Sequence, residues 1–120
     1  SSWLSANYAS GASGSDEAST MDVAWFVVNS DATTKTVGLK TANYLGLHDM
    51  SGNVYEFCWD IYSTYPGEAQ TDYRGAATGN TRVRRGGGWF SELIKVQGGY
   101  RAASFLDEDP DLEYGFRIAR

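Results

Sequence analysis

Four residues within one short stretch have the types and spacing of a hard-cation site. Asp49 and Glu56 are carboxylates, and Gly52 and Val54 lie between them among turn-forming residues. Calcium binds carboxylates together with the backbone carbonyl groups of a tight turn, so these four residues can converge on one ion. The alternative is that Asp49 caps backbone N–H groups of the turn and Glu56 pairs with an arginine. The sequence leaves both interpretations open.

The other potentially reactive side chains exclude several kinds of metal and catalytic site. Cys58 is the only cysteine and His48 the only histidine, which excludes an internal disulfide, a multi-cysteine metal site and a histidine pair. We interpret Cys58 as a small buried hydrophobic residue. The acidic run at residues 107–113 is interpreted as a solvated loop rather than as a catalytic carboxylate pair. The glycines at 86–88 lack the Lys-Ser/Thr that follows in a phosphate-binding loop.

Short runs of aromatic and β-branched residues predict the strands that must position these side chains. The predicted strands cover residues 54–59, 82–85, 100–103 and 114–119, with a further short strand at 36–39. A helical turn is expected at residues 42–47, leading into the candidate cation loop.

The remaining segments are predicted from composition and turn signals. Residues 1–20 are rich in Ser, Gly and Ala and are expected to form an exposed loop. Residues 21–28 are apolar and are expected to form a short buried segment. Residues 90–99 fit either a strand or irregular surface chain.

Length and charge bound the class of protein. The 120 residues suggest one domain, and the 14 glycines with many aromatics favour β and loop structure over a helical bundle. The net charge of −5 argues against non-specific nucleic-acid binding, so no nucleic-acid partner is expected. No apolar run reaches the length of a membrane span.

Three blocks of the sequence resemble the formylglycine-generating (sulfatase-modifying factor) family. Residues 46–57 read G-L-H-D-M-S-G-N-V-Y-E-F and are similar to the family's G-L-x-D-M-x-G-N-V-x-E-W. Residues 82–89 resemble its R-V-x-R-G-G-S-W, and residues 99–120 resemble its A-Y-R … P-D … G-F-R-L-A-R ending. The resemblance implies an α+β, C-type-lectin-like fold with small twisted antiparallel sheets, few short helices and much irregular chain.

The resemblance bears on metals as well. The four candidate calcium ligands match one calcium site of the family, while the other site, around residues 22–25, lacks its polar ligands here. In the family's enzymes two cysteines that bind copper follow the R-V-x-R-G-G-S-W motif, and the approximate matching positions hold Ser91 and Val96. No copper is therefore expected, and the chain is expected not to be an enzyme.

Members of the family carry a comparable length of chain before the position of Ser1. We therefore expect residues 1–120 to be the C-terminal part of a longer domain of this kind. The N-terminal part would be a partner, either as a separate chain or as a cleaved one.

One branch of the family, the variable proteins of diversity-generating retroelements, lacks the catalytic cysteines and displays variable residues in this C-terminal region. The chain resembles that branch, of the type found in treponemes. The resemblance implies a non-enzymatic protein that binds a protein or cell-surface ligand, at the cell surface or secreted. The alternatives are a formylglycine-generating-type oxidoreductase relative and a carbohydrate-binding lectin.

The predicted ligand-binding residues stand between the motif residues. They are Phe90, Ser91, Leu93, Ile94, Phe105, Leu106, Asp107 and Leu112. We expect six of them to lie largely on one exposed face and to be supported from beneath by motif residues. These six are Phe90, Ser91, Leu93, Phe105, Leu106 and Leu112. The expected supporting residues are Trp89, Tyr100, Arg101, Phe116 and Arg117.

Overall fold

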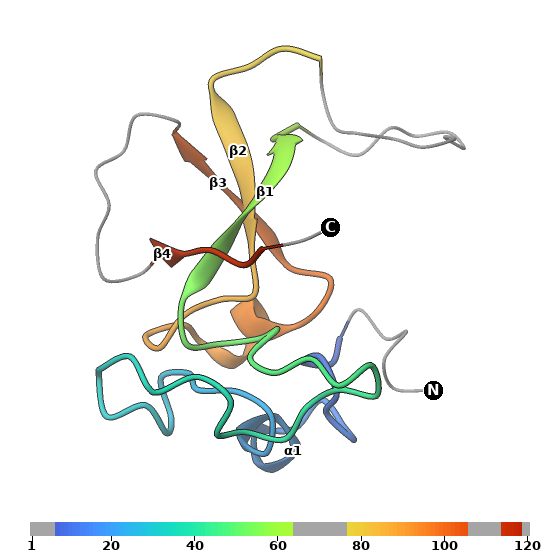
Figure 1. Cartoon of the computed structure of the whole chain (residues 1–120), viewed down its shortest axis with the longest axis vertical. Helices are drawn as coiled ribbons and strands as arrows, with labels where there is room; N and C mark the ends of the chain where they lie inside the picture. The colour runs from blue at the N-terminus through green and yellow to red at the C-terminus, as the bar shows by residue number, and fades with distance from the viewer. Residues whose placement is uncertain (1–6, 64–76, 106–113, 119–120) are drawn as a thin grey trace.

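The computed structural model describes residues 7–63, 77–105 and 114–118. Figure 1 shows a small curled sheet above a layer of irregular chain that holds one short helix. In chain order the elements are α1 (Glu17–Met21), β1 (Tyr55–Ile61), β2 (Thr81–Arg85), the 3-10 helix η2 (Leu93–Val96), β3 (Arg101–Phe105) and β4 (Tyr114–Gly115). Within the described residues, no helix is long and apolar enough to cross a membrane.

The sheet has the strand order β3-β2-β1-β4. β2 pairs antiparallel with both β1 and β3, whereas β4 pairs parallel with β1. The register places Phe57 opposite Arg84 and Glu56 opposite Arg85. Because successive side chains of a strand point to opposite faces, aromatic and acidic residues of β1 separate onto the two sides of the sheet.

One side of the sheet carries a set of rings and guanidinium groups that we call the aromatic–arginine face. Its members are Tyr55, Phe57, Trp59, Arg82, Arg84 and Tyr114. The opposite side carries Glu56 and Arg85, which are paired in register.

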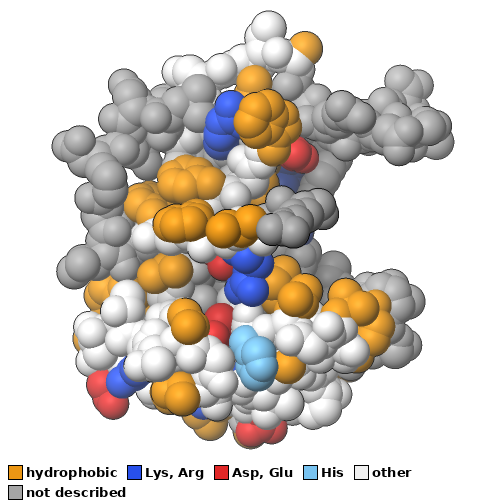
Figure 2. All heavy atoms as spheres, in the orientation of Figure 1, with side chains coloured by type: hydrophobic (Ala, Val, Ile, Leu, Met, Phe, Trp, Pro, Cys, Tyr) orange, Lys and Arg blue, Asp and Glu red, His pale blue; other side chains and the backbone are white. Residues whose placement is uncertain are grey.

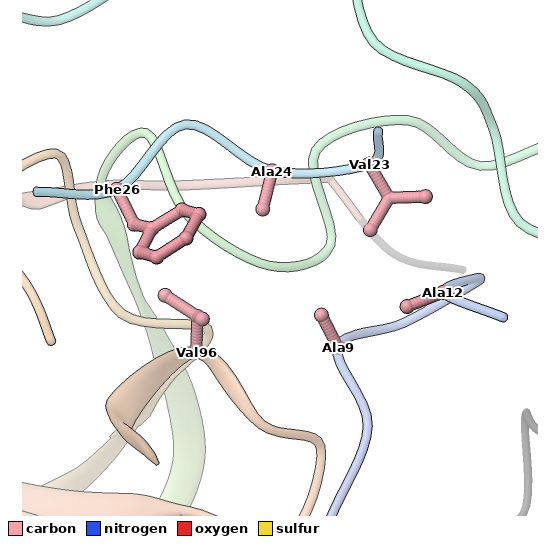
Figure 3. Close-up of a cluster of buried hydrophobic side chains, with 6 residues drawn as sticks. All are labelled: Ala9, Ala12, Val23, Ala24, Phe26 and Val96. Carbon is pink, nitrogen blue, oxygen red and sulfur yellow. The ribbon is translucent and has the colours of Figure 1, made fainter. Parts of the chain in front are cut away.

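The compact core lies below the sheet, within the irregular layer. Phe26 and Val96 are fully buried and point toward each other, with small side chains filling the space beside them (Figure 3). Ala9 and Ala12 belong to this cluster, and α1 begins next to it with Asp16 as its N-cap, which accepts a hydrogen bond from Ser19 N at 3.2 Å. The core therefore joins segments that lie far apart in the sequence.

A turn at Gly52–Asn53 connects this layer to β1. Asn53 N donates to Trp25 O at 2.7 Å, and Asn53 O accepts from Trp89 N at 2.7 Å. Gly52 and Asn53 both have positive φ, at 78° and 68°. A Cβ on Gly52 would overlap the carbonyl group of Trp25, so this position accepts only glycine.

The strands at 54–59, 82–85 and 100–103 are confirmed, with shifts of one or two residues at their ends. The strand predicted at 114–119 is shorter, since only Tyr114 and Gly115 pair with β1. Residues 36–39 form a turn instead of a strand, and residues 42–47 form a hydrogen-bonded turn without a helix.

Three expectations about burial were wrong. Ala9 and Ala12 belong to the core, although their segment reads as exposed loop. Residues 90–99 contain η2, whose Val96 is fully buried. Phe116 was expected to support the fold from beneath, yet it is 84% exposed.

We expect Gly52→Ala to destabilise the intact protein much more than Gly38→Ala does. Both glycines have positive φ, which costs a residue with a Cβ about 1–2 kcal/mol, but only the Gly52 change also forces an overlap with Trp25. Nothing lies within 4 Å of a Cβ at Gly38, so that variant is the matched control for backbone strain. Thermal unfolding checks this, and equal losses in the two variants would contradict it.

We also expect residues 1–120 alone to unfold without a cooperative transition. Trp59 and Phe116 are 80% and 84% exposed, and Ile118 is similarly exposed, so the sheet presents large apolar side chains to solvent. A further segment of the kind expected from the sequence would bury them. Calorimetry of residues 1–120 is the test, and a sharp, reversible transition would contradict the prediction.

Candidate functional site

The four residues predicted to hold calcium line one cavity of about 650 Å3, which we call the loop cavity. Asp49 and Gly52 come from the turn region, Val54 directly precedes β1, and Glu56 lies in β1. Arg117, which follows β4, also lines the cavity. Figure 2 shows basic and acidic side chains close together below the strands.

Two different partners hold the two carboxylates of the loop cavity. Asp49 Oδ2 accepts from Gly38 N at 2.8 Å, whereas Asp49 Oδ1 is buried and has no hydrogen-bond partner. Glu56 accepts from Arg117 Nε at 3.1 Å, and Arg117 Nη2 donates to His48 O at 2.8 Å and Asp49 O at 3.1 Å. These are the interactions of the alternative interpretation, in which Asp49 caps a turn and Glu56 pairs with an arginine.

The ion pair does not fully offset the burial of Glu56. Desolvation raises the pKa of the Glu56 carboxyl, while the neighbouring Arg117 guanidinium opposes that rise. Asp49 raises the pKa further, as a nearby like charge. The carboxylates therefore repel each other across the cavity, and a cation there lowers that repulsion.

The predicted ligand-binding residues near the glycine bend take different environments. Phe90 is partly buried, and its ring centroid lies 6.1 Å from that of Tyr55 and 5.3 Å from that of Trp89. Ser91 was expected to be exposed, which is wrong, because it is buried and its Oγ accepts from Gly88 N at 2.9 Å. Phe90 thus borders the aromatic–arginine face, and Ser91 fixes the bend.

The rest of that predicted set does not gather beside Phe90 in the part of the chain that the structure describes. Leu93 packs against the core cluster. Ile94 is 58% exposed and borders a separate cavity of about 260 Å3. Phe105 belongs to β3, but its side chain lies outside the described residues, as do Leu106, Asp107 and Leu112 altogether.

The aromatic–arginine face was not predicted from the sequence. The guanidinium carbon of Arg84 lies 4.4 Å from the ring centroid of Tyr55 and 5.3 Å from that of Tyr114, which itself stacks on Phe57 at 5.3 Å. Arg82 lies over Trp59 at 4.8 Å. The signal for this face was the alternation of aromatic residues at 55, 57 and 59 and of arginines at 82 and 84.

Cys58 lies on β1 and borders another cavity, of about 460 Å3, together with Arg85 and Gln97. The thiol is partly buried, and this burial raises the pKa of Cys58, although the Arg85 charge lowers it. A raised pKa leaves the thiol protonated and weakly nucleophilic at neutral pH.

Comparison with known proteins identifies the family. The model of the sulfatase-modifying factor enzyme 1-like domain matches residues 3–120. The chain belongs to this formylglycine-generating enzyme family. Among solved structures it is similar to Treponema denticola variable protein 1, with a TM-score of 0.79, 34% identity and coverage of 86% of this chain and 37% of that one.

Other relatives share the domain within different proteins. PvdO from Pseudomonas aeruginosa matches with a TM-score of 0.67 and 25% identity, covering 79% of this chain and 38% of that one. Chaperone protein LppX of Paenibacillus barcinonensis is 33% identical over 94 residues, which are 78% of this chain and 30% of that protein. The serine/threonine-protein kinase pkn1 of Chlamydia caviae is 41% identical over 86 residues, 66% of this chain and 13% of the kinase. The chain thus spans less than two fifths of the length of each relative.

These comparisons confirm the C-type-lectin-like fold of the formylglycine-generating family. Ser91 and Val96, which approximately match the family's cysteines, are both buried and carry no thiol, and Cys58 is the only cysteine of the sequence. The copper ligands of the family's enzymes are therefore missing from these positions.

Of the two carboxylates in the loop cavity, only one is available to bind calcium. The buried Asp49 Oδ1 lacks a partner and suits a hard cation, but Glu56 already pairs with Arg117. Among the described residues, no three His, Cys, Asp or Glu side chains are grouped to hold a metal. A calcium ion would rely on Asp49, backbone carbonyl groups and a Glu56 shared with Arg117.

Calcium binding at the loop cavity stays a prediction. We expect added calcium to raise the melting temperature of the EDTA-treated intact protein, because a ligand that binds only the folded state stabilises it by mass action. Asp49→Asn should remove the shift, and Asp31→Asn is the matched control, since Asp31 is exposed and lies outside the cavity. An unchanged melting temperature at saturating calcium would contradict the prediction, and the Arg117 guanidinium would then be the positive charge that balances the carboxylates of the cavity.

Proposed function

We propose that the protein is a non-enzymatic ligand-binding protein that displays its binding surface on a C-type-lectin-like scaffold. The observation that carries the proposal is the similarity to Treponema denticola variable protein 1, at 34% identity over 86% of this chain. It is supported by Ser91 and Val96 at the positions of the catalytic cysteines. The partner class that fits is a protein or another cell-surface ligand.

The distribution of apolar side chains supports binding rather than catalysis. The backbone of the glycine bend and of the Gly52–Asn53 turn is fixed by hydrogen bonds, so the scaffold around Phe90 is rigid. Phe57 and Trp59 are exposed on the same face of the sheet as Tyr55, the strand residue whose ring neighbours Phe90. Clusters of exposed aromatic side chains on a rigid support are typical of protein-binding surfaces, where a few anchors carry most of the affinity.

A calcium-dependent lectin is the second candidate, and the unpartnered Asp49 Oδ1 favours it. In that case the binding surface would lie at the loop cavity, and ligand binding would be lost with EDTA. The first candidate places the surface at Phe90 and predicts binding that persists in EDTA.

To test the proposal, the partner can be captured from surface proteins with the intact protein and its affinity then compared between variants. We expect Phe90→Ala to weaken binding by about 2 kcal/mol, or roughly 30-fold. The melting temperature should fall much less than in a core variant, because Phe90 is only partly buried. Phe26→Ala is the contrasting variant, since loss of this buried ring should cost about 3–5 kcal/mol of stability.

A second assay addresses catalysis directly. The intact protein, copper and oxygen are incubated with a cysteine-containing peptide, and mass spectrometry follows conversion of the thiol to an aldehyde. We expect no product. Turnover of the peptide, or an affinity for the partner that does not change in Phe90→Ala, would overturn the ligand-display proposal.

A further inference from the structure

Arg84 lies at the centre of the aromatic–arginine face without a carboxylate partner. The salt bridges within residues 7–63, 77–105 and 114–118 join Lys35 to Asp31 and Arg117 to Glu56, and neither includes Arg84. Its Nη1 donates to the hydroxyl group of Tyr114, while its Nε is buried and has no hydrogen-bond partner. A buried N–H of a charged group without an acceptor is costly, so binding of an acceptor that reaches it is favoured.

Ser104 provides a second unpartnered polar group on the same face. It is 1% exposed, and its Oγ has no hydrogen-bond partner. β2 and β3 pair without a register shift, with Ala102 opposite Arg84 and Ser104 opposite Arg82. Directly opposite residues share a face of the sheet, so Ser104 and Arg84 are diagonal neighbours on it.

The charge around Arg84 makes the face complementary to an acid. Glu56 of β1 is in register with Arg85 and so points to the other side of the sheet, where it pairs with Arg117. Among the residues that the structure describes, the face therefore has a positive centre, although the whole chain carries a net charge of −5. Phe57 and Trp59 add exposed rings beside that centre.

We propose that the aromatic–arginine face binds an acidic segment of a protein ligand, with an Asp or Glu carboxylate of that ligand accepting hydrogen bonds from Arg84 and Ser104. The inference rests on the proposed ligand-binding function and names the chemistry of its partner. A carboxylate there is shielded from water by the rings of Tyr55 and Tyr114, which strengthens a charge-assisted hydrogen bond. Phe57 and Trp59 pack against apolar side chains next to the acid.

A nucleic acid fits this face less well than an acidic polypeptide does. Nucleic-acid binding depends on several phosphate contacts, and the net charge of the chain repels a polyanion. Arg82, the other guanidinium of the face, already donates to the carbonyl group of Trp59. Of the two arginines of this face, only Arg84 is available to a ligand, and a single guanidinium suits one carboxylate better than a row of phosphates.

The experiment uses two synthetic probes, the peptide acetyl-Glu-Phe-Glu-amide and its uncharged counterpart acetyl-Gln-Phe-Gln-amide, with the intact protein. NMR titration follows the Nε–H resonance of Arg84, and we expect the acidic peptide to shift it and to bind at least tenfold more tightly. Arg84→Lys should reduce that binding at least tenfold, because lysine keeps the charge but loses the planar fork. Ser104→Ala should weaken it severalfold.

Lys35→Gln is the control for loss of one positive charge, because Lys35 lies over Trp25 in the irregular layer, and it should leave binding within twofold. Equal binding of the two peptides, an unshifted Nε–H resonance, or tighter binding of inorganic phosphate or an octameric oligo-dT would overturn the proposal. If Arg84→Lys does not fold, the comparison of the two peptides on the unaltered protein still decides.

Failure of this inference is distinguishable from failure of the proposed function. A protein partner whose affinity depends on Phe90 but not on Arg84 or on its own acidic residues leaves the function standing and refutes the acidic-segment inference. Binding of the acidic peptide at Arg84 by a protein that captures no partner supports the carboxylate site and refutes the function.

Discussion

The rest of the structure depends on the backbone tie that the Gly52–Asn53 turn makes with distant segments. Asn53 is bonded through its main chain to Trp25 and Trp89, and its side-chain amide pairs with both backbone groups of Lys35, at 2.9 and 3.0 Å. Gly52 N donates to Gly86 O at 2.6 Å, which brings in the glycine bend. In a fold with few regular hydrogen-bonded elements, such a buried polar network supplies the order that strands and helices supply elsewhere.

The same turn determines what each face of the sheet can do. Because β1 starts at a fixed point, its alternation sends Glu56 toward Arg117 and Phe57 toward Arg84. A slip of one residue would exchange the two sets of side chains between the faces. The loop cavity and the aromatic–arginine face are therefore two products of one register, the first polar and ion-paired, the second aromatic and positively charged.

The sequence predicted what is local and missed what is long-range. The strand positions followed from the alternation of aromatic residues, and the Gly52–Asn53 turn followed from the turn preferences of glycine and asparagine. Both kinds of preference act within a few residues. The burial of Ala9 and Val96 did not, because it arises from contacts between segments nearly ninety residues apart, and small or single apolar residues carry no periodicity. The pairing of Glu56 with Arg117 could not be predicted for the same reason. The spacing of the arginines at 82 and 84, in contrast, is a local pattern from which the aromatic–arginine face could have been predicted.

Arg84 shows how a fixed scaffold would leave room for the proposed binding function. It occupies the open position of the R-V-x-R motif, and Tyr55, whose ring it covers, occupies the open position of N-V-x-E. The neighbouring motif residues perform backbone and packing duties: Val83 is buried, and Arg85 donates to Gly98 O at 2.7 Å. Since side chains alternate along β2, a change at Arg84 alters one face without disturbing the hydrogen bonds of the other. Alternation thus separates the residues that hold the fold from those free to meet a partner, and the unpartnered Arg84 Nε belongs to the second group.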